Sequence, residues 1–151
     1  MQTGEPLYHD DIQVGTRFVS GSCQLTQPDI IDFASRFDPQ PFHTDPQLAT
    51  ASLFGGLAAS GWHTAAVTMK LMVEHGLHLA GGMIGAGCEL NWPAPTRPGD
   101  TLHVEGEVIE VAPAAPGRKR GFITMRSETR NQDGTVVQAM VAKLVVQRRE
   151  G

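Results

Sequence analysis

The most informative segment of the chain reads Phe37-Asp38-Pro39-Gln40-Pro41-Phe42-His43-Thr44-Asp45. Its two prolines each fix the backbone φ angle and disfavour the helical region for the residue before them. We therefore expect a stiff, extended and non-helical segment. Such a segment would aim the Asp38 carboxyl and the His43 imidazole at one point, with little rotational freedom between them.

A second segment follows and reads Phe54-Gly55-Gly56-Leu57-Ala58-Ala59-Ser60-Gly61-Trp62. A helix that begins at Gly61 would present unpaired backbone N–H groups and the positive end of its dipole near the same point. Glycine there would also let a carbonyl group approach the backbone closely. An acid, a base and an anion-stabilising helix end are the groups that proton transfer next to a carbonyl requires.

Helical patterns lie on both sides of this region. Thr26 is a candidate N-cap, with Pro28 and Asp29 in the first turn, and it predicts an amphipathic helix over residues 27–36. One helical turn is expected around residues 46–52. The clearest helix covers residues 61–75, with Gly76 as its C-cap. Its apolar stripe is Trp62, Ala65, Ala66, Met69, Met72 and Val73, and we expect Met69 and Met72 in the core.

Strand patterns dominate the second half of the chain. They cover residues 83–92, 101–111, 121–130 and 135–147, and a shorter one covers residues 16–24. The stretch Asn131-Gln132-Asp133-Gly134 predicts a hairpin turn. We expect the last four strands to follow one another in antiparallel succession. One long helix and a curved antiparallel sheet predict an α+β fold in which the sheet wraps the helix.

Length and composition narrow the possible functions. A chain of 151 residues, 40% hydrophobic and 19% charged, indicates one globular domain over residues 1–151. The net charge of −4 argues against a nucleic-acid partner. The sequence has no long apolar run, and residues 1–6 lack the features of a signal peptide, so we expect no membrane span and a cytoplasmic location. Cys23 and Cys88 are expected to be buried thiols and not a disulfide.

These motifs together carry a resemblance. Asp-x-x-Pro-x-His-x-Asp from Asp38, then Phe-Gly-Gly and Ser60-Gly61, then Pro-x-x-x-x-Pro-Gly-Asp from Pro93 to Asp100, resemble the MaoC-like dehydratases, also known as (R)-specific enoyl-CoA hydratases. The similarity extends over residues 7–147. It implies a hot-dog fold and the reversible hydration of a trans-2-enoyl thioester, on coenzyme A or acyl carrier protein, without a metal or other cofactor. Because such a sheet leaves a free edge and an apolar face, we also expect a homodimer, or a dimer of dimers.

The resemblance implies roles for particular residues, and the chemistry of each agrees. His43 would take a proton from water, and the Gly61 N–H would bind the thioester oxygen. Asp38 would deliver a proton to the α-carbon if burial raises its pKa, and it could also help to hold the same water. Further substrate-binding positions are Gln40, Ser60, Trp62, Phe54 and Gly55.

The chain departs from the family pattern at two places. Family members usually have Asn where this chain has Gln40, and often His-Gly-Met where it has Ser60-Gly61-Trp62. Ser60 could therefore be a helix cap instead of a pocket residue. The Trp62 ring could form a wall of the acyl pocket, or it could pack into the core.

Other interpretations of the same residues stay open. Asp38 could cap a turn, and His43 could be a hydrogen-bonded residue under a loop. A hot-dog thioesterase would need a carboxylate on the central helix, where Glu74 is the only one and lies at the far end. A non-catalytic hot-dog domain that binds acyl-CoA or a partner is the third possibility.

Two groups of residues could either bind a ligand or simply belong to the solvated surface. His75 and His78 could be a metal pair, but a hydrated helix end is the simpler interpretation. The short basic clusters, Arg118-Lys119-Arg120 and Arg148-Arg149, are expected to be a solvated turn and terminus. The alternative is a contact with phosphate, for instance at the nucleotide end of coenzyme A.

Overall fold

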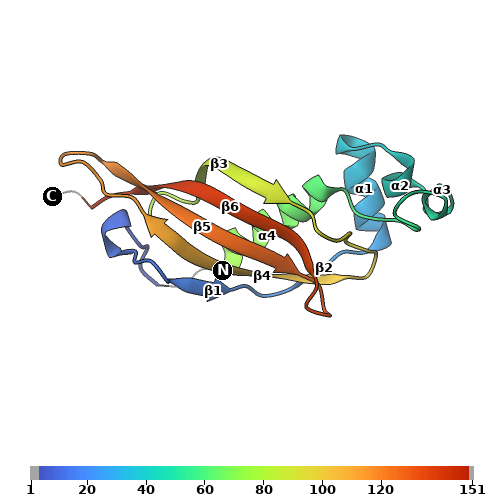
Figure 1. Cartoon of the computed structure of the whole chain (residues 1–151), viewed down its shortest axis with the longest axis horizontal. Coiled ribbons are helices and arrows are strands. Elements are labelled where there is room, and N and C mark those ends of the chain that lie inside the picture. Colours follow the sequence, from blue (N-terminus) through green and yellow to red (C-terminus); the bar gives the residue numbers. More distant parts are fainter. Residues whose placement is uncertain (1–3, 150–151) are drawn as a thin grey trace.

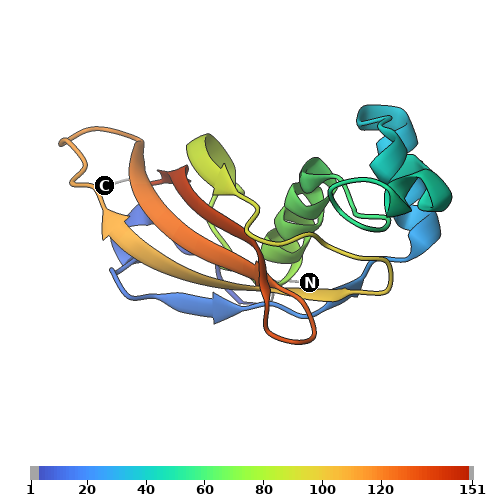
Figure 2. The same ribbon diagram turned by 45° about the vertical axis from the view of Figure 1, so that its right-hand side comes forward.

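A computed structural model describes residues 4–149, and in it a curved antiparallel sheet wraps the long helix α4 (Gly61–His75), as Figures 1 and 2 show. Residues 1–3, on which part of the signal-peptide expectation rests, lie outside the described residues. The α+β architecture confirms the predicted fold class. No helix among the described residues is long and apolar enough to cross a membrane.

The sheet has the strand order β1-β4-β5-β6-β3, and β2 pairs separately with β4. Its strands are β1 (Arg17–Val19), β2 (Cys23–Gln24), β3 (Ile84–Asn91), β4 (Thr101–Val111), β5 (Arg120–Arg130) and β6 (Val136–Gln147). The single strand predicted over residues 16–24 is thus two short strands. The expected succession of four neighbours is wrong for β3, because residues 92–100 carry the chain across the sheet and β3 pairs with β6. One edge of β3 therefore has no strand beside it.

Alternation along β4 produces the inner face of the sheet. Leu102, Val104 and Val108 are buried, and Gly106 lies where a Cβ would come within 2.2 Å of the Phe18 ring. The buried face ends there, because a bulge between Val108 and Glu110 leaves Glu110 exposed.

The predicted turn between β5 and β6 is confirmed. The Asn131 side-chain oxygen accepts hydrogen bonds from the backbone N–H groups of Asp133 and Thr135, and Gly134 has a φ of 78°. This local chemistry closes the hairpin that aligns the two long strands.

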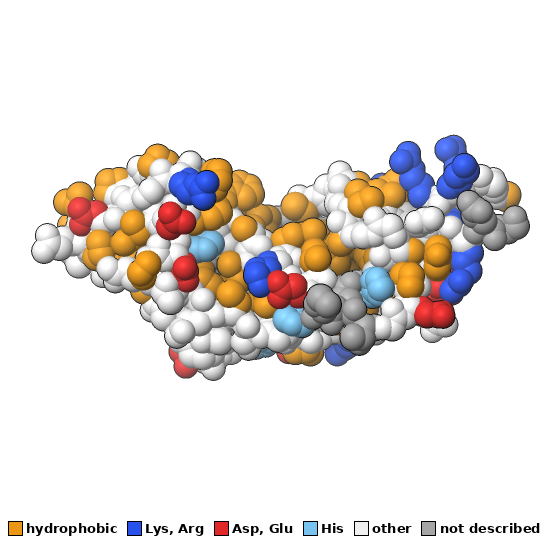
Figure 3. Space-filling model, turned by 180° about the vertical axis from the view of Figure 1, so that it is seen from behind, with side chains coloured by type: hydrophobic (Ala, Val, Ile, Leu, Met, Phe, Trp, Pro, Cys, Tyr) orange, Lys and Arg blue, Asp and Glu red, His pale blue; other side chains and the backbone are white. Residues whose placement is uncertain are grey.

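Helix α4 begins and ends as predicted, but its buried face is different from the one expected. The buried residues are His63, Thr64, Val67, Thr68, Leu71 and Met72. Thr64 and Thr68 can be buried because each hydroxyl hydrogen-bonds another threonine hydroxyl, at 3.1 Å and 2.6 Å. Of the predicted apolar stripe only Met72 is fully buried, and Trp62 is 61% exposed. The outer face of α4 is therefore apolar, and Figure 3 shows hydrophobic side chains on that side of the molecule.

Three further helices lie together at one end of the sheet (Figure 1): α1 (Gln27–Phe37), α2 (Pro41–Thr44) and α3 (Pro46–Thr50). The Thr26 capping box predicted for α1 is present. The expectation of a non-helical segment is wrong for α2, because Pro41 occupies a first helical position, where its missing N–H costs nothing. Asp45 caps α3 through the N–H groups of Gln47 and Leu48.

The cysteines are both free, but neither is fully buried. Cys88 is exposed, since β3 is an edge strand whose residues are nearly all exposed. Cys23 is partly buried on β2. The prediction of two buried thiols is therefore wrong, while the prediction of no disulfide is confirmed.

Candidate active site

Asp38 and His43 meet at the junction of α1 and α2. Asp38 is the C-cap residue of α1, and its backbone N–H donates to the Ala34 carbonyl. One turn of α2 then brings the His43 Nε2 atom to 3.3 Å from the Asp38 Oδ2 atom. The side chains of His43 and Asp38 are 6% and 19% exposed. We refer to them as the Asp38–His43 pair.

The backbone fixes the tautomer of His43. Its Nδ1 atom lies 2.7 Å from the carbonyl oxygen of Ala58, which can only accept a hydrogen bond. Nδ1 therefore carries a proton, and in the neutral ring Nε2 offers a lone pair on the side of Asp38. The rings of Phe42 and Phe54 pack around the imidazole, with centroids 4.6 Å and 5.7 Å away. This arrangement suits a base that faces one defined point.

The Asp38 carboxylate is held by two donors. Gln40 Nε2 donates to Oδ1 at 2.6 Å, and Ser60 Oγ donates to Oδ2 at 2.7 Å. Burial raises the pKa of Asp38, but these hydrogen bonds and the nearby His43 outweigh burial and hold the pKa below its usual value. The condition that we set for Asp38 as a proton donor is therefore not met, and the group is a carboxylate at neutral pH.

Ser60 connects this carboxylate to the central helix. Its side-chain oxygen accepts a hydrogen bond from the Trp62 N–H, as an N-cap residue does, while its hydroxyl donates to Asp38. The sequence left helix cap and pocket residue as alternatives for Ser60. The structure confirms the helix cap, and the role of Ser60 as a pocket residue stays a prediction.

Gly61 is the first residue of α4, so its N–H is one of the groups without an acceptor inside the helix. A Cβ at this position would lie 2.6 Å from Cε2 of Trp92. The indole of Trp92 thus covers one side of Gly61, and its Nε1 atom donates to the buried Gln138 side chain at 3.0 Å. Glycine is required here for packing, a reason that the sequence did not indicate.

Two features border this region that sequence reasoning missed. Trp62 packs edge-to-face on Trp92, with ring centroids 5.3 Å apart, so its ring stays at the surface and not in the core. Arg97 donates to the backbone carbonyls of Phe54, Gly56 and Leu57. The Arg97 guanidinium fixes the loop that presents Phe54 to His43. Gly55, in the same loop, has a φ of 67°, which indicates a backbone role.

An apolar cavity of about 300 Å³ lies between α4 and strands β3, β5 and β6. We call it the methionine cavity, because the lining includes every methionine after Met1: Met69, Met72, Met83, Met125 and Met140. Unbranched thioether side chains adapt to irregular shapes. No single residue in the sequence pointed to this cavity, because the five come from separate elements.

The remaining candidates have other partners. Glu74 is partly exposed and forms an ion pair with Lys70 at 2.5 Å, away from the Asp38–His43 pair. His78 is bonded through Nδ1 to the Gly4 carbonyl, and residues 4–149 contain no cluster of three or more metal-ligating side chains. His63 is buried and stacks on Phe33. None of them adds a reactive group to the site.

Known proteins resemble this chain in sequence and in fold. The model of the MaoC like domain matches residues 11–132. The chain is similar to the MaoC-like dehydratase from Rhodospirillum rubrum, whose crystal structure shares 54% identity and a TM-score of 0.92, covering 96% of this chain and 99% of that one.

Two curated proteins are also similar. The uncharacterized protein YdeM of Bacillus subtilis is 35% identical over 127 residues, covering 82% of this chain and 86% of YdeM. A 3-hydroxybutyryl-CoA dehydratase of Methylorubrum extorquens is 31% identical over 109 residues, covering 71% of this chain and 67% of that protein. The hot-dog fold implied by the sequence is thus confirmed.

Proposed function

The chain belongs to the MaoC-like dehydratase family, and we propose that it catalyses the reversible hydration of a trans-2-enoyl thioester to an (R)-3-hydroxyacyl thioester. The observation that carries this proposal is the Asp38–His43 pair beside the start of α4. A base, a carboxylate and a helix N-terminus are brought together by α1, α2 and α4. The dehydratase from Methylorubrum supports the same class of reaction.

The groups present at the site can account for both proton transfers of the reaction. A water held between the Asp38 carboxylate and His43 Nε2 would attack the β-carbon and give one proton to Nε2. The resulting imidazolium would be stabilised by the Asp38 carboxylate, and Nε2 would return the proton to the α-carbon. The water oxygen then forms the new C–O bond, and the C=C bond becomes single. Asp38 stays ionised throughout, which agrees with its lowered pKa.

The Gly61 N–H would stabilise the charge that develops on the thioester oxygen. Hydrogen-bond donors at a helix N-terminus are worth most where charge appears only in the transition state. Because Trp92 covers one side of Gly61, the thioester would approach from the side of Ser60 and the Asp38–His43 pair.

The methionine cavity would receive the acyl chain. At a rise of about 1.5 Å per residue, Met69 and Met72 lie roughly 12 and 17 Å along α4 from Gly61. The helix thus offers a direct line from the reacting carbons to the cavity. Trp62 and Trp92 would form the wall at the entrance, next to Gly61.

A second copy of the chain is the proposed partner. The free edge of β3 and the apolar outer face of α4 adjoin each other, and both Met69 and Val73 are more than 40% exposed. Two β3 edges can pair with each other about a two-fold axis, which would cover both surfaces at once. Sedimentation should therefore show a dimer at micromolar concentration, and a stable monomer would contradict the proposal.

One set of assays separates the three possible functions. The protein is offered crotonyl-CoA and longer trans-2-enoyl-CoAs, and water addition, thiol release and binding without turnover are measured in parallel. Hydration without thiol release is the expected result. Thiol release would favour a thioesterase, which Glu74 disfavours because it lies at the far end of α4 and is paired with Lys70. Binding alone would indicate a non-catalytic domain.

A further inference from the structure

We propose that the basic end of the sheet binds the phosphate groups of a nucleotide-bearing thioester, coenzyme A, whose acyl part lies in the active site of a second copy. The basic end consists of Arg118, Lys119, Arg120, Arg148 and Arg149. This inference rests on the proposed function and on the proposed dimer. It narrows the carrier of the acyl group from two candidates to one.

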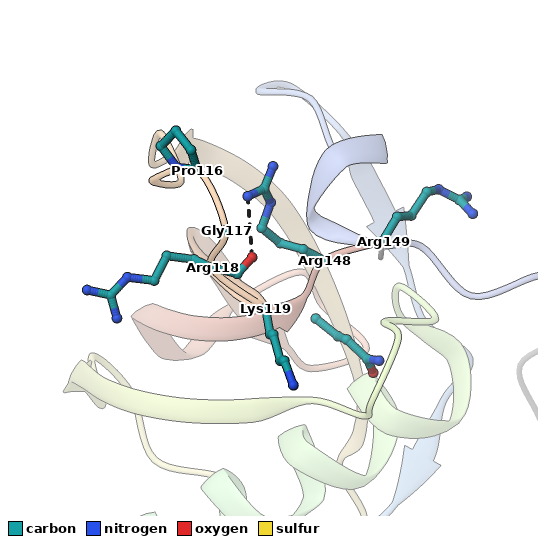
Figure 4. A pocket seen from close by; sticks show the side chains of 7 residues that line it. Pro116, Gly117, Arg118, Lys119, Arg148 and Arg149 are labelled. Atoms are coloured by element: carbon teal, nitrogen blue, oxygen red, sulfur yellow. Dashed lines mark hydrogen bonds between the residues drawn. The ribbon is translucent and has the colours of Figure 1, made fainter. Parts of the chain in front are cut away.

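Strand pairing builds the site from two distant parts of the sequence. Arg120 is paired with Gln147, and the Arg148 N–H donates to the Lys119 carbonyl at 2.9 Å. The two basic clusters thus border one hollow of about 700 Å³. Figure 4 shows its lining, and Figure 3 shows Lys and Arg side chains gathered at this end of a molecule whose net charge is −4.

Four of the five cations line the hollow, and they differ in how they are held. Arg148 donates to Asp10 and to the carbonyls of Ala115 and Arg118, and Arg149 is paired with Asp11. Arg118 and Lys119, by contrast, form no ion pair with any residue in the described part of the chain. Two arginines therefore build the wall of the hollow, and two neighbouring cations are left to meet a ligand.

The spacing of the free cations suits an extended ligand. In Figure 4 the side chains of Arg118 and Lys119 leave the loop in different directions, so they do not converge on one small anion. The nucleotide end of coenzyme A carries a pyrophosphate and a separate phosphomonoester. Arginine and lysine are the usual partners of such groups. A hollow fits a nucleotide better than the flat surface of a carrier protein.

Topology relates this hollow to the active site of the other copy. Within one protomer the basic end and helices α1–α3 lie at opposite ends of the sheet (Figure 1). Strand β3 begins beside the basic end, where Ile84 pairs with Val145, and ends beside Trp92 and Gly61. If two β3 edges pair antiparallel, the start of each strand lies beside the end of the other. The basic end of one copy would then flank the Asp38–His43 pair of its partner.

The test compares two thioesters that differ only in the nucleotide. The double variant Arg118→Gln/Lys119→Gln is assayed with a trans-2-enoyl-CoA and with the same acyl group on pantetheine. We expect kcat/KM to fall at least about tenfold for the coenzyme A thioester and to stay unchanged for the pantetheine thioester, since hydrogen bonds between charged side chains and phosphate are among the stronger ones. The matched control Arg17→Gln/Arg126→Gln removes two charges that pair with Glu107, and it should change neither value.

A binding measurement separates this proposal from the proposed function. Calorimetry with adenosine 3′,5′-bisphosphate should show binding to the unmodified protein and to the control, and a loss of at least about tenfold for the double variant. If neither thioester is hydrated, the hydratase proposal fails. The calorimetry still shows whether the basic end binds phosphate groups. Equal effects on both thioesters, or no effect on either, would overturn the phosphate site.

Two further outcomes would assign the basic end to another partner. If the double variant dissociates to monomers in sedimentation, the cations serve the dimer contact. If it loses activity only with acyl carrier protein thioesters and the bisphosphate does not bind, the partner is the carrier protein. Either result would overturn the proposed site.

Discussion

The helical end and the basic end of the molecule hold their charges in opposite ways. At the helical end the Asp38 carboxylate receives hydrogen bonds from Gln40 and Ser60 and faces His43. At the basic end Arg118 and Lys119 extend from a loop without a carboxylate partner among residues 4–149. The difference corresponds to the function proposed for each end, catalysis at the helical end and phosphate binding at the basic end. Bond-making needs groups fixed within a fraction of an ångström, whereas binding a mobile polyphosphate needs charge more than position.

The largest effect should follow from changing the groups that are held most firmly. Asp38→Asn or His43→Ala should lower turnover in the hydration assay by about 10²–10⁴-fold, the usual contribution of one acid–base group. The fold should persist, as thermal melts would show. Asp45→Asn is the matched control, because it makes the same chemical change seven positions away in a carboxylate that only caps α3. Near-normal turnover in either pair variant would disprove the mechanism.

The packing at Gly61 should give the next largest effect. Gly61→Ala places a Cβ 2.6 Å from the Trp92 ring, so the ring or the helix start must move. Overpacking of this kind typically costs about 1–3 kcal/mol in the free energy of unfolding, which urea denaturation measures. The double variant Gly61→Ala/Trp92→Leu should recover part of the loss. If Gly61→Ala is as stable as the original protein, the start of α4 is not tightly packed. The helical end would then not hold its groups as firmly as proposed.

A smaller effect should follow at the entrance of the acyl pocket. Trp62→Met should raise kcat/KM for long or branched enoyl thioesters relative to short ones by about tenfold, as expected for a change of a few methylenes in an apolar pocket. Because Trp62 is 61% exposed, stability should change by no more than about 0.5 kcal/mol. Trp62→Phe, which keeps a ring, should lie between the two. A large drop in melting temperature with unchanged chain-length preference would return Trp62 to a structural role.

The pH dependence of stability should report on Ser60. The pKa of Asp38 in the folded protein lies below its usual value, so the carboxylate stabilises the fold at neutral pH, and this contribution is lost as the pH falls through the pKa of the folded state. Ser60→Ala removes a donor to that carboxylate and brings the pKa back toward its usual value, so the free energy of unfolding, measured by urea denaturation, should fall less steeply on acidification. Ser60→Thr keeps the hydroxyl and should keep the original pH dependence. The same pH dependence in Ser60→Ala as in the unmodified protein would mean that Ser60 does not set this pKa.

The smallest effect is expected at the basic end. Arg118→Gln alone should change the free energy of unfolding by less than about 0.5 kcal/mol, because the side chain is exposed and makes no ion pair within the described residues. Denaturation in urea, with Arg148→Gln for comparison, measures this. Arg148→Gln should cost more, since its guanidinium joins Asp10 to two carbonyls. If Arg118→Gln lowers the free energy of unfolding more than Arg148→Gln does, Arg118 is not the more weakly held of the two arginines.

Local signals in the sequence were sufficient for much of the fold. The capping box at Thr26, the turn before Thr135 and the bounds of α4 all depend on neighbours a few residues apart. The pairing of β3 with β6 was not predictable, because the long connection through residues 92–100 does not indicate where it leads.

The parts of the site that depend on distant contacts were also missed. Thr64 and Thr68 look like surface residues until Thr96 and Thr129 supply their partners. Trp92 likewise has no local signal that links it to Gly61. The residues of the Asp38–His43 pair could be named from the sequence because two prolines and one helical turn join them. The direction of the Asp38 pKa could not, since it depends on Gln40 and Ser60 outweighing burial.

The methionine cavity has a thermodynamic consequence. Its five thioether side chains each have three rotatable bonds, so they can adapt to contents of different shape. A bound acyl chain would restrict this motion, so part of the gain from burying the chain is offset by lost side-chain entropy. Affinity for any single chain is thereby reduced, while chains of different shape can be accommodated at similar cost. If the cavity receives the acyl chain as proposed, its lining would favour breadth of selection over tight binding of one acyl group.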